Sequence, residues 1–214
     1  MSMDKEQQPE SEGRGGEKGK RRQNSRRKIL DAARQMFVER GYHDTRPQDI
    51  SRAAGVGHGT FYLHFADKRE CFAAFVEEAQ VGLQKEVDKW TAEAGNMEEH
   101  LRGVLKGILT FSKENPRVLT AAVTDPGLIG QGENECVPRQ KTLIETWADE
   151  WAHGLAVDRD RGRIHADYDL PTIGYSIVGF TLFACRYALD SGRDTNEILD
   201  STAHFLIRAL KVDD

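Results

Sequence analysis

The sequence predicts an all-α protein, with an N-terminal three-helix unit of the helix-turn-helix type followed by a larger helical domain. Two patterns lead to this prediction. Residues 27–68 hold an apolar-periodic segment, a Gly-Tyr break, a short capped segment and a glycine-rich turn, in the order typical of a helix-turn-helix. After Lys68, apolar residues recur at helical spacing over most of the remaining chain.

The first helix is predicted over Ser25 to Arg40. Ile29, Ala33 and Phe37 recur at helical spacing and form one apolar face. Gly41 follows directly, and glycine readily adopts the left-handed conformation that commonly ends a helix. The chain is therefore expected to turn just after Arg40.

Two short helices are predicted next, joined by a tight turn. Thr45 and Gln48 have the spacing of a capping box, so the second helix is expected to start near Arg46. Gly55 ends it, and a third helix spans about Gly57 to Leu63. This third helix is too short to be a core element, and its small, aromatic and imidazole side chains are typical of a helix that reads DNA.

Residues 29–68 resemble the N-terminal domain of the TetR family of bacterial transcriptional repressors. The residues that carry the resemblance are Ala32, Ala33, Phe37, Gly41, Tyr42, Thr45, Ile50, Ala53, Ala54, Gly55, Val56, Gly59, Thr60, Phe61, Tyr62, His64, Phe65 and Lys68. They cover about a fifth of the chain. The resemblance implies a regulator that binds a near-palindromic operator as a homodimer and responds to a small molecule held by its C-terminal region.

Candidate DNA contacts cluster on the second and third helices. Hydroxyl and imidazole groups suit phosphate oxygens, and glycines let the backbone approach DNA closely. The resemblance adds Lys68 as a further phosphate contact. The predicted set is Thr45, Arg46, Gln48, Gly57, His58, Gly59, Thr60, Tyr62, His64 and Lys68. Arg46, Gln48, His58 and Thr60 are the members expected to reach base edges.

Positive charge gathers at the proposed DNA-binding end. Residues 1–68 hold 14 Lys and Arg against 10 Asp and Glu, whereas residues 69–214 have a net charge of −9. Residues 1–24 are almost devoid of apolar side chains, so we expect a disordered arm there. Its Lys18, Lys20, Arg21 and Arg22 are placed to contact DNA, but a solvated tail that only aids solubility explains them equally well.

Residues 69–214 are predicted to form a helical domain for effector binding and dimerisation, and residues 25–68 the DNA-binding domain. Apolar periodicity predicts helices over 67–90, 97–114, a short one ending near 123, 138–156, 170–189 and 194–212. Glycine and polar residues indicate a loop over 127–137, and charged residues indicate another over 158–169.

An effector pocket is implied by the resemblance rather than by any motif. Aromatic residues on the helices that the family uses to enclose ligand, with one histidine as a polar partner, give the candidate lining. The set is Trp90, His100, Phe111, Trp147, Trp151, Tyr175 and Phe180. Such residues indicate an apolar or aromatic effector. Aromatic stripes at helical spacing are more often core than pocket, so a packing role is the alternative.

The segment 170–189 is the most apolar part of the chain. A helix that is apolar all round is usually buried by protein on every side, and Ser176, Thr181 and Arg186 argue against a membrane span. The resemblance assigns this helix and the last one to a four-helix dimer interface. The predicted interface residues are Gly174, Ile177, Gly179, Ala184, Ile198 and Leu206.

Other functions find little support in the sequence. Three widely spaced cysteines without a C-x-x-C pair fit a reduced cytoplasm, and no metal or other cofactor is expected. The sequence has no G-x-S-x-G, H-E-x-x-H, Walker or Rossmann signature, so an enzyme is the weaker alternative. A helical adaptor without DNA binding is the other alternative.

Overall fold

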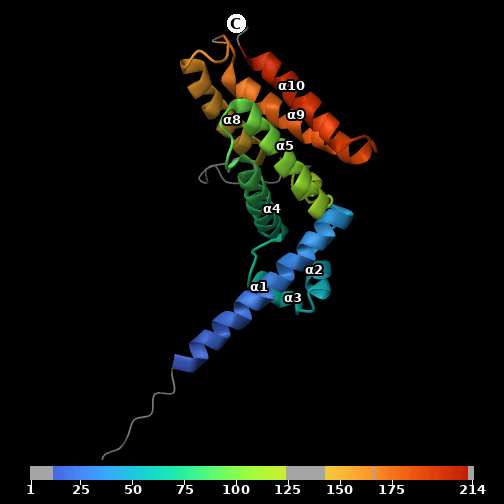
Figure 1. The fold of residues 1–214 in the computed structure, drawn as a ribbon. Coiled ribbons are helices and arrows are strands. Elements are labelled where there is room, and N and C mark those ends of the chain that lie inside the picture. The colour runs from blue at the N-terminus through green and yellow to red at the C-terminus, as the bar shows by residue number, and fades with distance from the viewer. Residues whose placement is uncertain (1–11, 124–142, 166, 212–214) are drawn as a thin grey trace, which may run out of the picture. The chain divides into compact units, whose positions relative to one another are not determined.

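The computed structural model describes residues 12–123, 143–165 and 167–211, which form α-helices joined by turns (Figure 1). Among these residues, the single β-type contact is an isolated bridge between Ile164 and Lys211. The chain divides into two compact units, Met1–Phe75 and Val76–Asp214. The prediction of an all-α fold is confirmed.

The first unit contains three helices and the start of a fourth. The observed third helix agrees with the predicted one once its two cap residues, Gly57 and Leu63, are included. The helices are α1 (Glu12–Arg40), α2 (Pro47–Ala53), α3 (His58–Tyr62) and the first residues of α4 (Lys68–Thr91).

Aromatic side chains form much of the core of this unit. Phe37 of α1 packs edge-on against Phe72 of α4 with ring centroids 5.0 Å apart, and the Tyr42 ring lies 5.0 Å from the same phenyl group. Phe61 of α3 and Phe65 just after it are almost completely buried. Burial of a phenylalanine side chain contributes roughly 1.5 to 3 kcal/mol to folding, so these two rings hold the short α3 in place.

The turn between α2 and α3 requires one glycine. Gly55 has a φ of +65°, in the left-handed region that other residues rarely adopt. Its backbone N–H donates to the carbonyl oxygen of Arg52, and the N–H of Val56 donates to that of Ser51 at 3.0 Å. These bonds satisfy carbonyls at the end of α2 and set the direction in which α3 begins.

Two predictions for this unit are wrong. Residues 12–24 belong to α1 rather than to a disordered arm. Glu, Gln, Lys and Arg favour helices, and extending an existing helix needs no new nucleation. Thr45 does not cap α2, because the N-cap is Arg46, which makes no side-chain capping bond. Thr45 is instead fully buried, and its hydroxyl donates to the carbonyl oxygen of Gly41 at 2.7 Å.

In its described residues, the second unit contains the rest of α4 and five further helices. The predicted loop 127–137 and the first residues of the predicted helix 138–156 lie outside the described residues. The C-terminal end of α8 extends beyond the prediction to Asp160, because the first residue that interrupts it is Gly162, with a φ of +68°. The helices are α5 (Met97–Glu114), α6 (Val118–Val123), α8 (Leu143–Asp160), α9 (Leu170–Asp190) and α10 (Thr195–Leu210).

Helix α9 packs against α8, α5 and α10. Its approach to α8 is so close that a Cβ atom at Gly174 would lie 2.2 Å from the carbonyl oxygen of Ala148. By length and composition alone, α9 is the one helix among the described residues that could cross a membrane, which is weak evidence for a span. Within this chain α9 is not buried on every side, since Phe183 is 79% exposed.

Candidate nucleic-acid interface and ligand pocket

Helix α3 buries one face and exposes the other. Phe61 is completely buried, whereas His58, Gly59 and Tyr62 are exposed and Thr60 is half-buried. The His58 ring packs edge-on against the Tyr62 ring with centroids 5.2 Å apart. A Cβ atom at Gly59 would meet nothing within 4 Å, so the backbone there is open. The predicted contact groups of α3 therefore lie together on one accessible face.

The predicted contacts outside α3 divide into accessible and buried residues. Arg46 and Gln48 are exposed at the start of α2, and Gly57 is exposed as the N-cap of α3. Thr45 is the exception, because its side chain is fully enclosed and cannot reach DNA. The Thr45 hydroxyl holds the turn after α1, so its side chain is not among the DNA contacts that we propose.

Lys68 ties two segments of the first unit together. Its Nζ atom donates to the carbonyl oxygen of Tyr42 at 2.8 Å and lies 4.0 Å from the centroid of the Tyr42 ring. Burial lowers the pKa of Lys68 from its ordinary value of 10.5, while the Asp44 carboxylate acts in the opposite direction. The same atom also donates to the carbonyl oxygen of His43 at 3.5 Å, and because an ammonium group has three protons, one donor remains for a phosphate oxygen.

Two arginines of α1, Arg22 and Arg26, extend the cationic surface beside α3, and Arg22 belongs to the basic set expected to contact DNA. The Arg26 guanidinium lies 5.0 Å from the centroid of the Phe65 ring. Burial lowers the pKa of His64 below 6.5, and the positive charges of Arg22 and Arg26 lower it further. Arg22 and Arg26 are exposed and one helical turn apart on α1. The expected disorder of residues 12–24, which belong to α1, hid the helical spacing of these two arginines.

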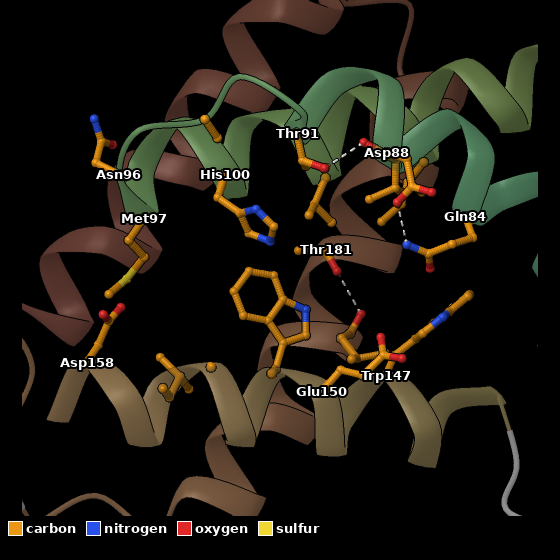
Figure 2. A pocket seen from close by; sticks show the side chains of 18 of the residues that line it. Gln84, Asp88, Thr91, Asn96, Met97, His100, Trp147, Glu150, Asp158 and Thr181 are labelled. Atoms are coloured by element: carbon orange, nitrogen blue, oxygen red, sulfur yellow. Dashed lines mark hydrogen bonds between the residues drawn. The ribbon is translucent and has the colours of Figure 1, made fainter. Parts of the chain in front are cut away.

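A pocket of about 480 Å³ opens within the second unit, and residues of α4, α5, α8 and α9 line it (Figure 2). Three of the predicted pocket residues, His100, Trp147 and Trp151, are among them. His100 of α5 packs edge-on against Trp151 of α8, with ring centroids 5.8 Å apart. Partial burial lowers the pKa of His100 below 6.5, so its imidazole is uncharged at neutral pH.

The other four predicted pocket residues do not line it. Trp90 is 47% exposed and lies under the Lys106 ammonium, 5.5 Å from the ring centroid. Phe111 is a core residue. Tyr175 and Phe180 are exposed, whereas α9 lines the pocket with Val178, Thr181 and Leu182. Sequence periodicity finds the apolar face of each helix but does not tell which neighbour that face meets.

Charged residues of the lining were also missed. Glu150 and Asp158 lie on the same face of α8 as Trp147 and Trp151, and Asp88 lies on α4. The spacing 147, 150, 151, 154, 158 places two carboxylates within an otherwise apolar stripe. A polar interruption of this kind is the signal that could have identified the pocket wall.

Most of the predicted dimer residues face inward. Gly174, Ile177, Ile198 and Leu206 are buried within this chain, whereas Gly179 and Ala184 are half-buried. The exposed residues of α9 and α10 are aromatic instead: Tyr175, Phe180, Phe183, Tyr187 and Phe205. The Phe180 and Phe205 rings stack with centroids 5.1 Å apart, so the two helices share one apolar surface, which we call the aromatic face.

Comparison with known proteins agrees with this geometry. Residues 29–75 match the family model described as bacterial regulatory proteins, tetR family. The uncharacterised transcriptional regulator YdgC of Bacillus subtilis is 27% identical over 158 residues, which cover 72% of this chain and 76% of YdgC. The transcriptional activator FasR of Mycolicibacterium smegmatis is 29% identical over 203 residues, covering 89% and 86% of the two chains.

The same fold occurs in solved structures. A tetR-family regulator from Shewanella sp. PV-4 superimposes with a TM-score of 0.70 over 88% of this chain and 99% of its own, at 20% identity. These relatives are transcriptional regulators rather than enzymes. The helix-turn-helix of α2 and α3, the family model that matches it and the shared all-α fold lead to one conclusion: the chain belongs to the TetR family of DNA-binding transcriptional regulators.

Proposed function

We propose that this protein is a ligand-responsive repressor that binds a near-palindromic operator as a homodimer and is released by a small molecule with an apolar or aromatic body. The observation that carries the DNA-binding part is the exposed face of α3, which presents His58, Gly59 and Tyr62 above a fixed aromatic core. Phosphate contacts position such a helix and base contacts specify the sequence.

A homodimer follows from the short length of α3. A helix of five residues contacts too few bases for useful specificity, whereas two copies related by a twofold axis read half-sites roughly 34 to 36 Å apart. The aromatic face of α9 and α10 supports this part of the proposal, because an exposed apolar patch commonly marks a protein interface.

The repressor role rests on analogy with named relatives. The repressor AcnR of Corynebacterium efficiens is 31% identical over 83 residues, which cover 42% of AcnR. FasR, which matches a larger part of this chain, is named an activator. Measuring the level of transcription from the target promoter, with and without the protein, tells repression from activation.

The cationic surface of α1 gives the sharpest test of DNA binding. We expect a gel shift with DNA that flanks the protein's own gene, and a footprint on a near-palindromic site. Arg22→Ala and Arg26→Ala should each weaken binding to all sequences alike, and each should reduce the slope of log affinity against log salt concentration by about one. Arg46→Ala should instead alter base preference.

Arg161→Ala supplies the matched control, since Arg161 is an exposed arginine of the second unit. It should leave both the affinity and its salt dependence unchanged. Loss of affinity in Arg161→Ala to the same degree as in Arg22→Ala would show that net charge, rather than the surface beside α3, governs binding.

A further inference from the structure

We infer that the pocket of the second unit selects an organic cation with an aromatic or apolar body. This inference rests on the proposed function, because it names the chemical class of the effector. The aromatic residues of the sequence indicate an apolar or aromatic effector but give no charge for it. The charges of the lining residues carry it.

Three carboxylates line the pocket, those of Asp88, Glu150 and Asp158. Arg163 is the one arginine or lysine of the described lining, and its guanidinium is paired with Asp158, with Nε donating to the carboxylate at 2.8 Å. Asp88 accepts a hydrogen bond from the Gln84 amide at 2.8 Å, which does not neutralise its charge. Neither Asp88 nor Glu150 has an ion-pair partner within the described part of the chain.

Two tryptophan rings line the same pocket as these two carboxylates. Trp147 and Trp151 are one turn apart on α8, and Glu150 lies between them in sequence on the same face. Figure 2 shows Asp88 and Gln84 on the side of the pocket that α4 forms, across from Trp147 and Glu150 on α8. The face of an indole ring attracts cations, and tryptophan does so best of the aromatic residues.

The remaining polar lining does not reverse this preference. Partial burial lowers the pKa of His100 below 6.5, so the imidazole adds no positive charge at neutral pH. Among the described lining residues, a carboxylate ligand would meet two unpaired negative charges and no free cation, and like charges in a partly desolvated site repel. A volume of about 480 Å³ holds a bicyclic or tricyclic cation.

Calorimetry with three probes of similar size and different charge tests the inference. The probes are (2-naphthylmethyl)trimethylammonium, 2-naphthylmethanol and 2-naphthylacetate, each titrated into the full-length protein at pH 7.5 and at low salt. We expect the cation to bind at least about tenfold more tightly than the alcohol, and the acetate to bind most weakly.

Variants that remove a carboxylate charge test whether Glu150 and Asp88 cause the preference for the cation. Glu150→Gln and Asp88→Asn should each weaken binding of the cation by about fivefold, and should weaken binding of the alcohol little. Both residues are exposed, so neither change is expected to disturb folding, which thermal melting checks. Glu93→Gln is the matched control, because Glu93 is exposed and lies outside the lining.

Equal affinity for the three probes, preference for the acetate, or no cation binding at millimolar concentration would each overturn the inference. An equal loss of cation affinity in Glu93→Gln and Glu150→Gln would also overturn it, because the pocket would then not be the source of selectivity. These titrations need no DNA, so they decide the charge class even if operator binding fails. If 2-naphthylacetate or 2-naphthylmethanol released the operator and the cation did not, the regulator proposal would stand and the cation inference would be wrong.

Discussion

Polar side chains of the helix-turn-helix unit divide between those that hold its turns and those that face solvent. The hydroxyl of Thr45 donates to the carbonyl oxygen of Gly41, and the ammonium of Lys68 donates to that of Tyr42. Both interactions fix the turn that follows α1. Motif spacing alone could not separate these roles, because a hydroxyl or an ammonium group can bind a carbonyl oxygen or a phosphate oxygen equally well.

Among single residues, His64 predicts that DNA binding depends on pH. In the free protein, burial together with the charges of Arg22 and Arg26 lowers its pKa below 6.5, so the ring is uncharged at neutral pH. DNA phosphates beside these arginines should raise that pKa, and binding should then take up a proton. Operator affinity should therefore rise as pH falls from about 7.5 through the pKa of the complex, and level off below the pKa of the free protein.

Fluorescence anisotropy with a labelled operator, at constant ionic strength between about pH 5.5 and 8, measures this dependence. His64→Gln should flatten the profile. His58→Gln separates the contribution of the other imidazole on this surface, since His58 lies on α3 beside Tyr62. A profile that keeps its full pH dependence in His64→Gln would place the titrating group elsewhere.

Helix boundaries could be predicted where caps and periodicity agree. Helix α5 has its predicted bounds, Met97 to Glu114, and the side chain of Asn96 caps it by accepting from the N–H of Glu99 at 2.9 Å. The boundaries of α9 and α10 agree with prediction within one or two residues, and Asp169 and Asp194 cap them. The start of α1 was not predicted, because a polar segment can continue a helix without burying any apolar surface.

Which helix faces meet each other could not be predicted in the same way. Gly174 was assigned to the dimer interface, but it lies at the contact of α9 with α8. Tyr175 and Phe180 were assigned to the pocket, but they are exposed on the aromatic face. Periodicity fixes angles within one helix, whereas the rotation of a helix against its neighbours depends on packing between segments far apart in sequence.

Two glycines of the second unit should respond in opposite ways to alanine. Gly174→Ala should destabilise the protein by about 1 to 3 kcal/mol, because its Cβ would lie 2.2 Å from the backbone oxygen of Ala148. Gly154→Ala should stabilise it by about 0.5 to 1 kcal/mol, because Gly154 is inside α8 and a Cβ there meets nothing within 4 Å. Urea unfolding measures both changes, and equal free energies of unfolding for the two variants would contradict this account of the contact between α8 and α9.

At the scale of the whole molecule, the aromatic face predicts the oligomeric state. Phe183→Glu should leave the fold of each copy intact, since Phe183 is 79% exposed, but should convert a dimer to monomers. A buried unpaired carboxylate in an interface is strongly unfavourable. Sedimentation velocity measures the assembly, and operator affinity should fall with it because the half-sites are no longer read together.

Val157→Glu is the control for this change, since Val157 is an exposed apolar residue of α8 outside the aromatic face. It should remain dimeric. A Phe183→Glu variant that sediments as a dimer with normal operator affinity would remove the aromatic face from the interface. Gly179→Leu provides a second probe of the same helix, because a Cβ at Gly179 meets nothing within 4 Å among the described residues of this chain.

The last prediction concerns coupling between effector and operator. Helix α4 begins at Lys68 in the unit that holds the helix-turn-helix, and its later residues Gln84, Asp88 and Thr91 line the pocket of the second unit. One continuous helix therefore belongs to both units, and a ligand that alters its position changes the free energy of DNA binding. We expect effector binding to weaken operator binding by about 5- to 150-fold, a coupling of about 1 to 3 kcal/mol.

Linkage requires the operator to weaken effector binding by the same factor. Titrating (2-naphthylmethyl)trimethylammonium by calorimetry, with and without a saturating operator duplex, measures one half of the cycle. Anisotropy of the labelled duplex with and without the cation measures the other half. Trp147→Ala should remove the response to the cation while keeping operator affinity, since Trp147 lines the pocket and lies outside the unit that holds the helix-turn-helix. A cation that binds with the same affinity in the presence and absence of operator occupies the protein without regulating it.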